Sequence, residues 1–110
     1  MSRKLLYSHS QRDDLVRGLS VDTALEEISR IEYLIKPYEY QVYEARETLR
    51  FLSDLRESLN RMDRERIEDA LKKLRNIESR AMPYRGFDIV ERALQHAKKL
   101  EEELKKILES

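Results

Sequence analysis

The residues best suited to chemistry are one histidine and two arginines in the last third of the chain. His96 follows Arg92 by four positions, and Arg85 precedes both in a segment that contains a proline and a glycine. Imidazole titrates near neutral pH and guanidinium binds phosphate oxygens, so these three side chains could serve an anionic substrate. The plainer interpretation is that His96 lies at the edge of a helical core and hydrogen-bonds a neighbouring helix.

Other kinds of chemistry find little support in the residue types present. The chain contains no cysteine, two histidines and two glycines. Thiolate ligands, a cysteine nucleophile and a glycine-rich phosphate loop are therefore excluded. The Glu-x-x-His pattern that builds di-metal sites in helical bundles does not occur in the sequence. We accordingly expect no catalytic residue, no cofactor and no metal site.

Tyrosine is the second unusual feature, with six in 110 residues. Tyr33 and Tyr40 are seven residues apart, a spacing that places both on one face of a helix. Aromatic and arginine side chains are enriched at protein interfaces, although the same combination also stacks on single-stranded bases. Residues 38–62 carry five acidic and four basic side chains, which argues against nucleic acid. We predict an interface with a second copy, forming a homodimer, or with a helical partner, made of Tyr33, Tyr40, Tyr43, Arg46, Arg50 and Phe51.

The tyrosines have a second possible cover within the same chain. Leu5, Leu6, Leu15, Val16 and Leu19 of the N-terminal segment could pack over them. An exposed patch of this size is unusual on a monomer, so one of the two covers is expected. Charge substitutions at the tyrosines separate the alternatives, because only an interface would change the mass of the particle.

The overall charge and hydropathy exclude several functions. The 22 basic and 22 acidic side chains give a formal net charge of zero, which removes the general attraction to nucleic acids and anionic membranes. No stretch approaches the roughly 18 apolar residues of a membrane span, and the N-terminal apolar run is too short for a secretory signal. We expect a cytoplasmic protein. The low count of asparagine and glutamine beside 44 charged residues is typical of thermophile proteins.

The elements that position these residues are predicted to be helices. Glycine and proline interrupt the chain at isolated positions only, and acid–base pairs such as Glu26–Arg30 support the segments between them. We predict an all-α antiparallel four-helix bundle, with Asp63 and Asp88 as helix caps. Residues 20–110 form this domain, and residues 1–19 form a partly ordered segment with a short helix that ends at Gly18. The main helices are expected at about 21–36, 38–61, 64–80 and 88–109.

Apolar residues alternate at spacings of three and four, as packed helices require. The pattern crosses Pro37 without losing phase, so two arrangements fit: a sharp turn at Pro37, or one helix over 21–61 kinked there. The residue before a proline disfavours helix, which favours the turn. Arg56 is the one charged residue on this seam, and we expect it at the rim beside Leu55 and Leu59. The seam comprises Val21, Ala24, Ile28, Ile31, Ile35, Tyr38, Val42, Ala45, Leu49, Leu52, Ile67, Ala70, Leu74, Ile77, Ala81, Val90, Ala93, Ala97, Leu100, Leu104 and Ile107.

The expected size and helix number resemble those of small helical ribonuclease and nucleotide-binding domains of the HEPN type. Those domains carry an arginine and a histidine on one helix at a longer spacing than in Arg92-Ala93-Leu94-Gln95-His96, so the resemblance covers the architecture alone. It implies an alternative function in RNA or nucleotide processing, with His96, Arg92 and Arg85 as the polar site. The composition and the tyrosines favour a non-enzymatic interaction or scaffold protein that self-associates.

Overall fold

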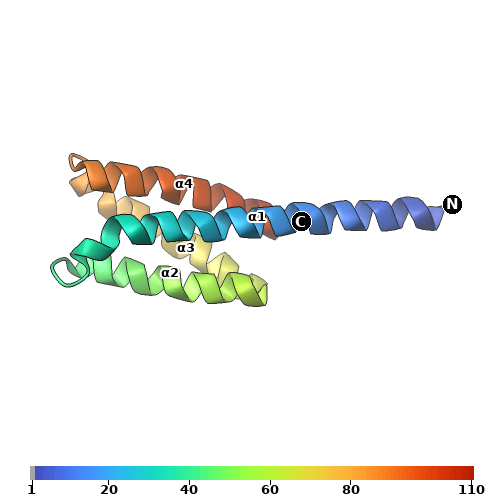
Figure 1. Ribbon diagram of the computed structural model, residues 1–110, viewed down its shortest axis with the longest axis horizontal. Coiled ribbons are helices and arrows are strands. Elements are labelled where there is room, and N and C mark those ends of the chain that lie inside the picture. The colour runs from blue at the N-terminus through green and yellow to red at the C-terminus, as the bar shows by residue number, and fades with distance from the viewer. Residues whose placement is uncertain (1) are drawn as a thin grey trace.

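A computed structural model describes the backbone of residues 2–110 and the side chains of residues 14–110. Four α-helices alternate in direction along one axis, and the described backbone contains no strand (Figure 1). The prediction of an all-α antiparallel four-helix bundle is confirmed. The helices are α1 (Ser2–Ile35), α2 (Tyr43–Arg61), α3 (Arg64–Ala81) and α4 (Asp88–Glu109), with 3-10 turns η1 (Lys36–Tyr38) and η2 (Met82–Tyr84).

The connection between α1 and α2 is a sharp turn, as the residue before Pro37 suggested. Pro37 is the second residue of the 3-10 turn η1, and the backbone N–H of Val42 donates to the carbonyl of Tyr38 at 2.9 Å. The single kinked helix over 21–61 is therefore excluded. The start of the second helix at residue 38 was wrong, because Val42 has an extended backbone and α2 begins at Tyr43. Residues 36–42 thus interrupt the helical phase of the seam.

The first helix is much longer than expected. α1 continues through Gly18, so the short helix ending at that glycine and the start of a new helix near residue 21 were wrong. One glycine costs a helix only about 1 kcal/mol, and helix formers on both sides carry the hydrogen bonds across it. The prediction that residues 1–19 are partly ordered stays a prediction, because most of the side chains in this segment lie outside the described ones.

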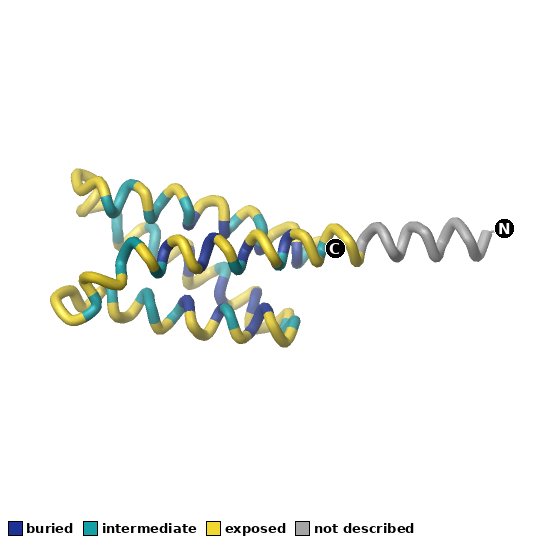
Figure 2. Tube along the Cα trace, in the orientation of Figure 1, coloured by how far each residue is buried: buried dark blue, intermediate teal, exposed yellow. Residues whose placement is uncertain are grey.

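The apolar seam forms the core, with the deepest burial toward one end of the bundle (Figure 2). α1 packs most extensively against α4, while α2 contacts α1 and α3. We call the end with the junction between α2 and α3 the closed end, and the end with residues 36–42 and 82–87 the turn end. The fully buried large side chains are Ile28, Leu52, Leu55, Leu59, Ile67, Leu74, Leu100, Leu104 and Ile107.

The closed end is shaped by a junction of only two residues. Met62 takes a left-handed conformation and its N–H reaches the carbonyls of Leu59 and Ser58, which ends α2. The side chain of Asp63 accepts a hydrogen bond from the backbone N–H of Arg66 at 3.3 Å, so the predicted cap of α3 is confirmed. Such a tight connection holds two antiparallel helices close together.

The predicted cap of α4 was wrong. Asp88 is the first residue inside the helix, and Phe87 occupies the cap position without a side-chain hydrogen bond. The Asp88 carboxylate instead pairs with Arg92, 3.1 Å away and one turn further along. Neither α2 nor α4, the two helices that begin at the turn end, has a side-chain cap.

Candidate functional site

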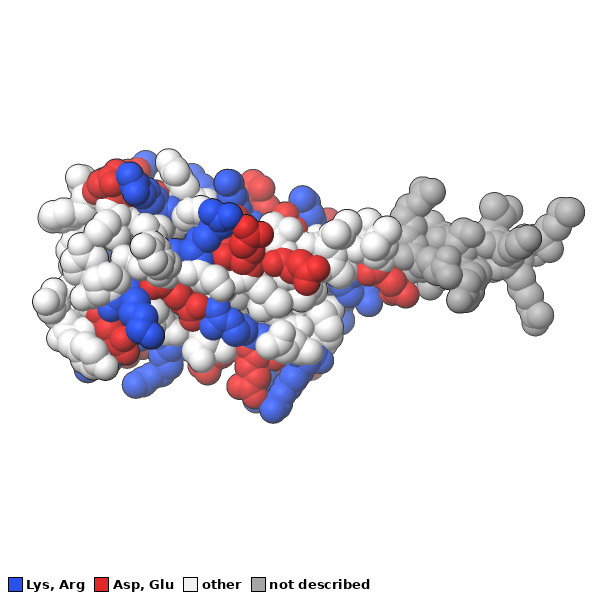
Figure 3. Space-filling model, viewed as in Figure 1, with Lys and Arg blue, Asp and Glu red and all other residues white. Residues whose placement is uncertain are grey.

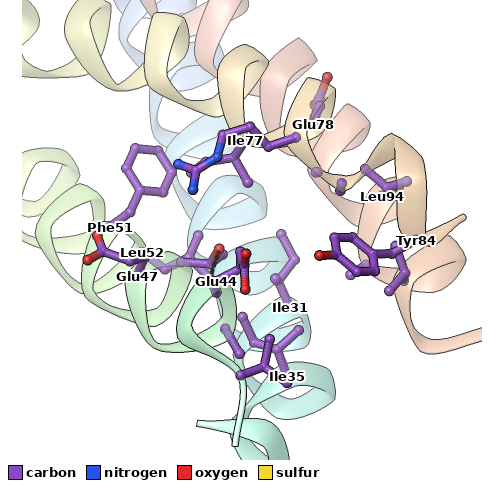
Figure 4. Close-up of a pocket in the computed structure, with 18 of the residues that line it drawn as sticks. Ile31, Ile35, Glu44, Glu47, Phe51, Leu52, Ile77, Glu78, Tyr84 and Leu94 are labelled. Atoms are coloured by element: carbon purple, nitrogen blue, oxygen red, sulfur yellow. Dashed lines mark hydrogen bonds between the residues drawn. The ribbon is translucent and has the colours of Figure 1, made fainter. Parts of the chain in front are cut away.

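An apolar cavity of about 870 Å³ occupies the bundle axis at the turn end. All four helices line it, so it lies between them as an unfilled part of the core. Figure 4 shows Ile31 and Ile35 of α1, Leu52 of α2, Ile77 of α3 and Leu94 of α4 on its walls.

Several seam residues that line this cavity are only half-buried, although Ile31, Leu52, Leu74 and Ala97, which also line it, are buried. Ala45, Ala81 and Ala93 stand where a closed bundle would have larger side chains, and each is partly exposed. Tyr38 and Val42, which lie in the turn, are 36% and 41% exposed. The prediction that seam residues are buried is therefore confirmed at the closed end, whereas at the turn end several of them are more exposed than predicted.

The lining of the cavity also carries charged side chains of both signs. The acidic ones are Glu44, Glu47, Asp54, Glu78 and Asp88, and the basic ones are Arg50, Lys73 and Arg80. Asp88 pairs with Arg92, whereas the other seven form no ion pair with another side chain among residues 14–110. The mouth is thus charged while the walls are apolar.

Large apolar side chains gather on the outer surface of the turn end. Eight of the eleven that are exposed among the described residues lie there or on the adjoining turn of α1. In the space-filling view this end is mostly uncharged, whereas both signs of charge mix along the sides of the bundle (Figure 3). The eight are Tyr33, Tyr38, Tyr40, Val42, Tyr43, Met82, Tyr84 and Phe87.

The tyrosines predicted to form one face are exposed, but they do not share one helix. Tyr33 is on α1, Tyr40 is in the turn and Tyr43 begins α2, with exposed fractions of 83%, 89% and 58%. The predicted seven-residue relation between Tyr33 and Tyr40 fails because the helix stops at Ile35. The three rings surround the turn end from different elements.

The other predicted interface residues divide between the surface and the cavity. The guanidinium of Arg46 lies 5.8 Å from the centre of the Tyr43 ring, and both are exposed. Hydrogen bonding to the Glu47 carboxylate raises the pKa of the Tyr43 hydroxyl. Arg50 and Phe51 instead line the cavity.

The described part of the N-terminal segment does not cover these tyrosines. Leu15, Val16 and Leu19 are themselves 65%, 46% and 59% exposed. Nearby, Arg17 donates to the carbonyl of Ser110 at 3.0 Å, which holds this part of α1 beside the end of α4, away from the turn end. Leu5 and Leu6, the other predicted covering residues, lie outside the described side chains.

The predicted polar site comes together only in part. Nδ1 of His96 lies 2.5 Å from Oε2 of Glu27, whose residue is 7% exposed. His96 therefore bonds a neighbouring helix, as its plainer interpretation predicted. Arg92 lines the same shallow hollow of about 430 Å³ beside His96, whereas Arg85 pairs with Glu91 at 3.2 Å and does not line it.

Glu27 belongs to a set of polar contacts between helices that the sequence analysis did not identify. Arg56 is at the rim, as predicted, and reaches from α2 to Glu32 of α1. Arg75 of α3 pairs with Glu101 of α4 at 2.7 Å. These contacts could have been suspected from the sequence, because a carboxylate next to a seam position lies within reach of a side chain on the neighbouring helix.

Glu78 is an unusual carboxylate between α3 and α4. Its Oε1 atom is buried and has no hydrogen-bond partner. Burial, with a further contribution from the charge of Glu101, raises the pKa of this carboxyl. Glu78 is therefore held in a place that disfavours its charge.

Comparison with known proteins gives no relative: no family model, curated protein or solved structure matches the chain. No group of three or more metal-ligating side chains converges within the part of the chain whose side chains are described. None of the described helices is both long and apolar enough to cross a membrane. The turn end and its cavity are therefore the candidate functional region.

Proposed function

We propose that this chain is a non-enzymatic helical interaction protein that self-associates through its turn end. The supporting observation is the concentration of exposed large apolar side chains at that end. A contiguous exposed apolar patch is uncommon on a protein that stays monomeric. The tyrosines, with an arginine stacked on one of them, match the composition of protein interfaces.

The area of the patch suits a second copy of the chain. Taking about 200 Å² for a fully exposed aromatic side chain, the apolar groups of residues 38–43 and 82–87 expose roughly 700 Å². A stable interface of standard size buries about 800 Å² on each partner. A two-fold axis would let the same patch meet its own copy, which is how most homodimers form.

Electrostatics also permits this association. The net charge of zero means that two copies do not repel each other at long range. We place the protein in the cytoplasm and propose a thermophilic source. The unfolding temperature tests the thermophilic source, since a midpoint near that of ordinary mesophile domains would contradict it.

The alternative function in RNA or nucleotide processing has one observation in its favour. The buried Glu27 orients His96 beside a hollow that Arg92 and Arg30 also line. Both arginines pair with carboxylates on their own helices, Arg92 with Asp88 and Arg30 with Glu26, which weakens their attraction for a phosphate. RNA cleavage that is lost in His96→Ala would favour this alternative.

The self-association is tested by measuring the mass in solution by light scattering coupled to size exclusion. We expect a particle of about 26 kDa, twice the 13.2 kDa of one chain. Tyr40→Glu combined with Tyr43→Glu is expected to give a folded monomer, because it places two charges in the interface. The matched control Leu15→Glu changes an exposed apolar residue away from the turn end and should leave the dimer intact.

Two results would contradict the proposal. One is a wild-type monomer at high micromolar concentration. The other is an unchanged dimer mass in the Tyr40→Glu, Tyr43→Glu variant while Leu15→Glu dissociates it, which would place the interface on α1.

A further inference from the structure

We infer, on the basis of the self-association proposed above, that the cavity at the turn end receives Tyr40 of the partner subunit, so that each copy anchors the other. The cavity and the exposed apolar patch of the turn end share four side chains, namely Tyr38, Val42, Tyr84 and Phe87. The cavity therefore opens within the surface that the dimer buries.

The segment that carries Tyr40 projects beyond the helix ends. It connects η1 to α2 and is drawn in teal and green at the left of Figure 1. Tyr40 is the most exposed of the large apolar side chains among residues 14–110, and it does not line the cavity of its own chain. The backbone N–H groups of Gln41 and Val42 both donate to the carbonyl of Tyr38, at 3.2 and 2.9 Å, which fixes the turn. A side chain presented by an ordered turn loses less freedom on binding than one on a flexible segment.

A projection beside a cavity makes this surface complementary to itself. A two-fold axis places the projecting turn of each copy at the cavity of the other, so both contacts form together. Aromatic side chains that fill desolvated pockets are among the largest contributors to the stability of protein interfaces. The cavity volume of about 870 Å³ leaves room for the tyrosine ring and for parts of the turn on either side of it.

The cavity supplies both kinds of contact that a tyrosine needs. Ile31, Ile77 and Leu94 form aliphatic walls that lack dispersion contacts on the side of the empty space (Figure 4). The hydroxyl of Tyr84 points toward the cavity in Figure 4, and it forms no hydrogen bond with another residue among 14–110. A phenol hydroxyl both donates and accepts, so it can bond the hydroxyl of the partner's Tyr40.

The charges of the lining favour a second copy over a small charged ligand. Seven charged lining side chains have no ion-pair partner among residues 14–110, four of them acidic and three basic. A ligand of one sign is repelled by part of this set, whereas a copy of the same surface brings both signs. Glu44 in the first turn of α2 can pair with the partner's Arg80, which lies in the last turn of α3. Such complementarity between copies adds specificity to the contact.

The test measures the dissociation constant of the dimer by light scattering over a series of concentrations. Ala93→Leu adds bulk to the cavity wall and should raise the dissociation constant at least tenfold. Tyr40→Ala should raise it by a similar factor, and the double variant should lose little more than either single variant, because both remove one contact. Gln95→Leu adds the same side chain on the exposed side of α4 and should dimerise like the wild type. Ala81→Leu, at a second half-buried wall position, repeats the test on α3 in case Ala93→Leu does not fold.

A second readout follows the inserted side chain itself. The chain contains no tryptophan, so Tyr40→Trp introduces a single indole. Its fluorescence emission should shift to shorter wavelength as the protein concentration rises and the dimer forms. Adding Ala93→Leu should abolish that shift.

The insertion and the dimer fail in different ways. A dimer that is unaffected by Ala93→Leu and Ala81→Leu, losses that add fully in the double variant, or an indole emission that does not move on dimerisation would overturn the insertion and leave the self-association standing. Native mass spectrometry that finds a small molecule bound to each wild-type chain would also overturn it, because the cavity would have a different occupant. A wild type that stays monomeric at high micromolar concentration would overturn both.

Discussion

The two ends of this bundle follow the same apolar pattern but differ in how completely they are filled. At the closed end Leu55, Leu59, Leu100 and Leu104 are at most 1% exposed. At the turn end the equivalent seam positions border a cavity of about 870 Å³. The spacing of apolar residues therefore determines which face of each helix turns inward, but not how closely the helices approach.

The connections and the sizes of the side chains explain the difference. α2 and α3 are joined by two residues, whereas seven residues join α1 to α2 and six join α3 to α4. Longer connections allow helix ends to stand apart, and alanines at positions 45, 81 and 93 cannot fill the space between them. A tight junction with large aliphatic side chains gives a stable core, while loose junctions with alanines leave room for a ligand or partner.

The largest effect that tests this contrast comes from truncating core leucines. Leu100→Ala is expected to lower the free energy of unfolding by about 2–5 kcal/mol, because Leu100 is fully buried. Leu94→Ala on the same helix should cost clearly less, since Leu94 already borders the cavity. Denaturant titration of both variants gives the comparison. Equal losses would mean that the turn end is packed as tightly as the closed end.

A second, smaller effect concerns the polar contact between α1 and α4. His96→Ala removes the hydrogen-bond partner of the buried Glu27, and an unsatisfied buried group costs about 1–3 kcal/mol. Gln95→Ala is the matched control on the same helix, at an exposed position. The two variants are compared by thermal and denaturant unfolding. A loss for His96→Ala no greater than for the control would show that the contact adds nothing to stability.

The sequence predicted the fold well and the candidate site only partly. Helix positions, the turn at Pro37 and the rim position of Arg56 follow from local rules, namely periodicity, proline geometry and the width of the apolar stripe. The length of α1 did not, because one glycine is a weak terminator when its neighbours favour helix. Asp88 failed as a cap because Phe87 already takes the extended backbone that a cap requires.

The cavity lay beyond the reach of sequence reasoning for a different reason. A seam of alanines and isoleucines predicts a buried core at every position. Whether these side chains fill the space between the helices depends on the distance between the helices. Tyr33 and Tyr40 were likewise placed on one face by assuming that helical phase continues across residues 36–42. The contact between Arg75 and Glu101 joins two different helices. The residue pattern within one helix does not show which helices are neighbours, so such contacts could not be predicted.

Helix caps provide a third test, with an effect of about 1 kcal/mol. Asp63→Ala should destabilise the closed end by about that amount, because it removes the hydrogen bond to the Arg66 backbone. Phe87→Ser should act in the opposite direction by supplying a cap that α4 lacks, while little burial is lost at a residue that is 66% exposed. Thermal unfolding of monomeric samples measures both changes in stability, the expected decrease for Asp63→Ala and the expected increase for Phe87→Ser. Destabilisation by Phe87→Ser would instead indicate that Phe87 packs against the turn end in solution.

The smallest expected effect concerns Glu78, on α3 beside the boundary between the two ends. Burial and the charge of Glu101 raise the pKa of its carboxyl, while Lys98, Arg75 and Lys105 partly oppose this. The folded chain therefore holds the Glu78 proton to a higher pH than the unfolded chain does. Stability from this group is present at acidic pH and is lost as the pH rises from the ordinary pKa of glutamate through the raised one.

Glu78→Gln removes this titration and keeps the shape of the side chain. We expect the variant to unfold at the same temperature as the wild type at acidic pH, and at a slightly higher temperature near neutral pH. Glu68→Gln, at an exposed position of the same helix beyond its first turn, is the control and should show no such divergence. A variant less stable than the wild type at neutral pH would mean that the ionised Glu78 is satisfied by Lys98, Arg75 or Lys105. The carboxylate would then strengthen the packing of α3 against α4 instead of weakening it.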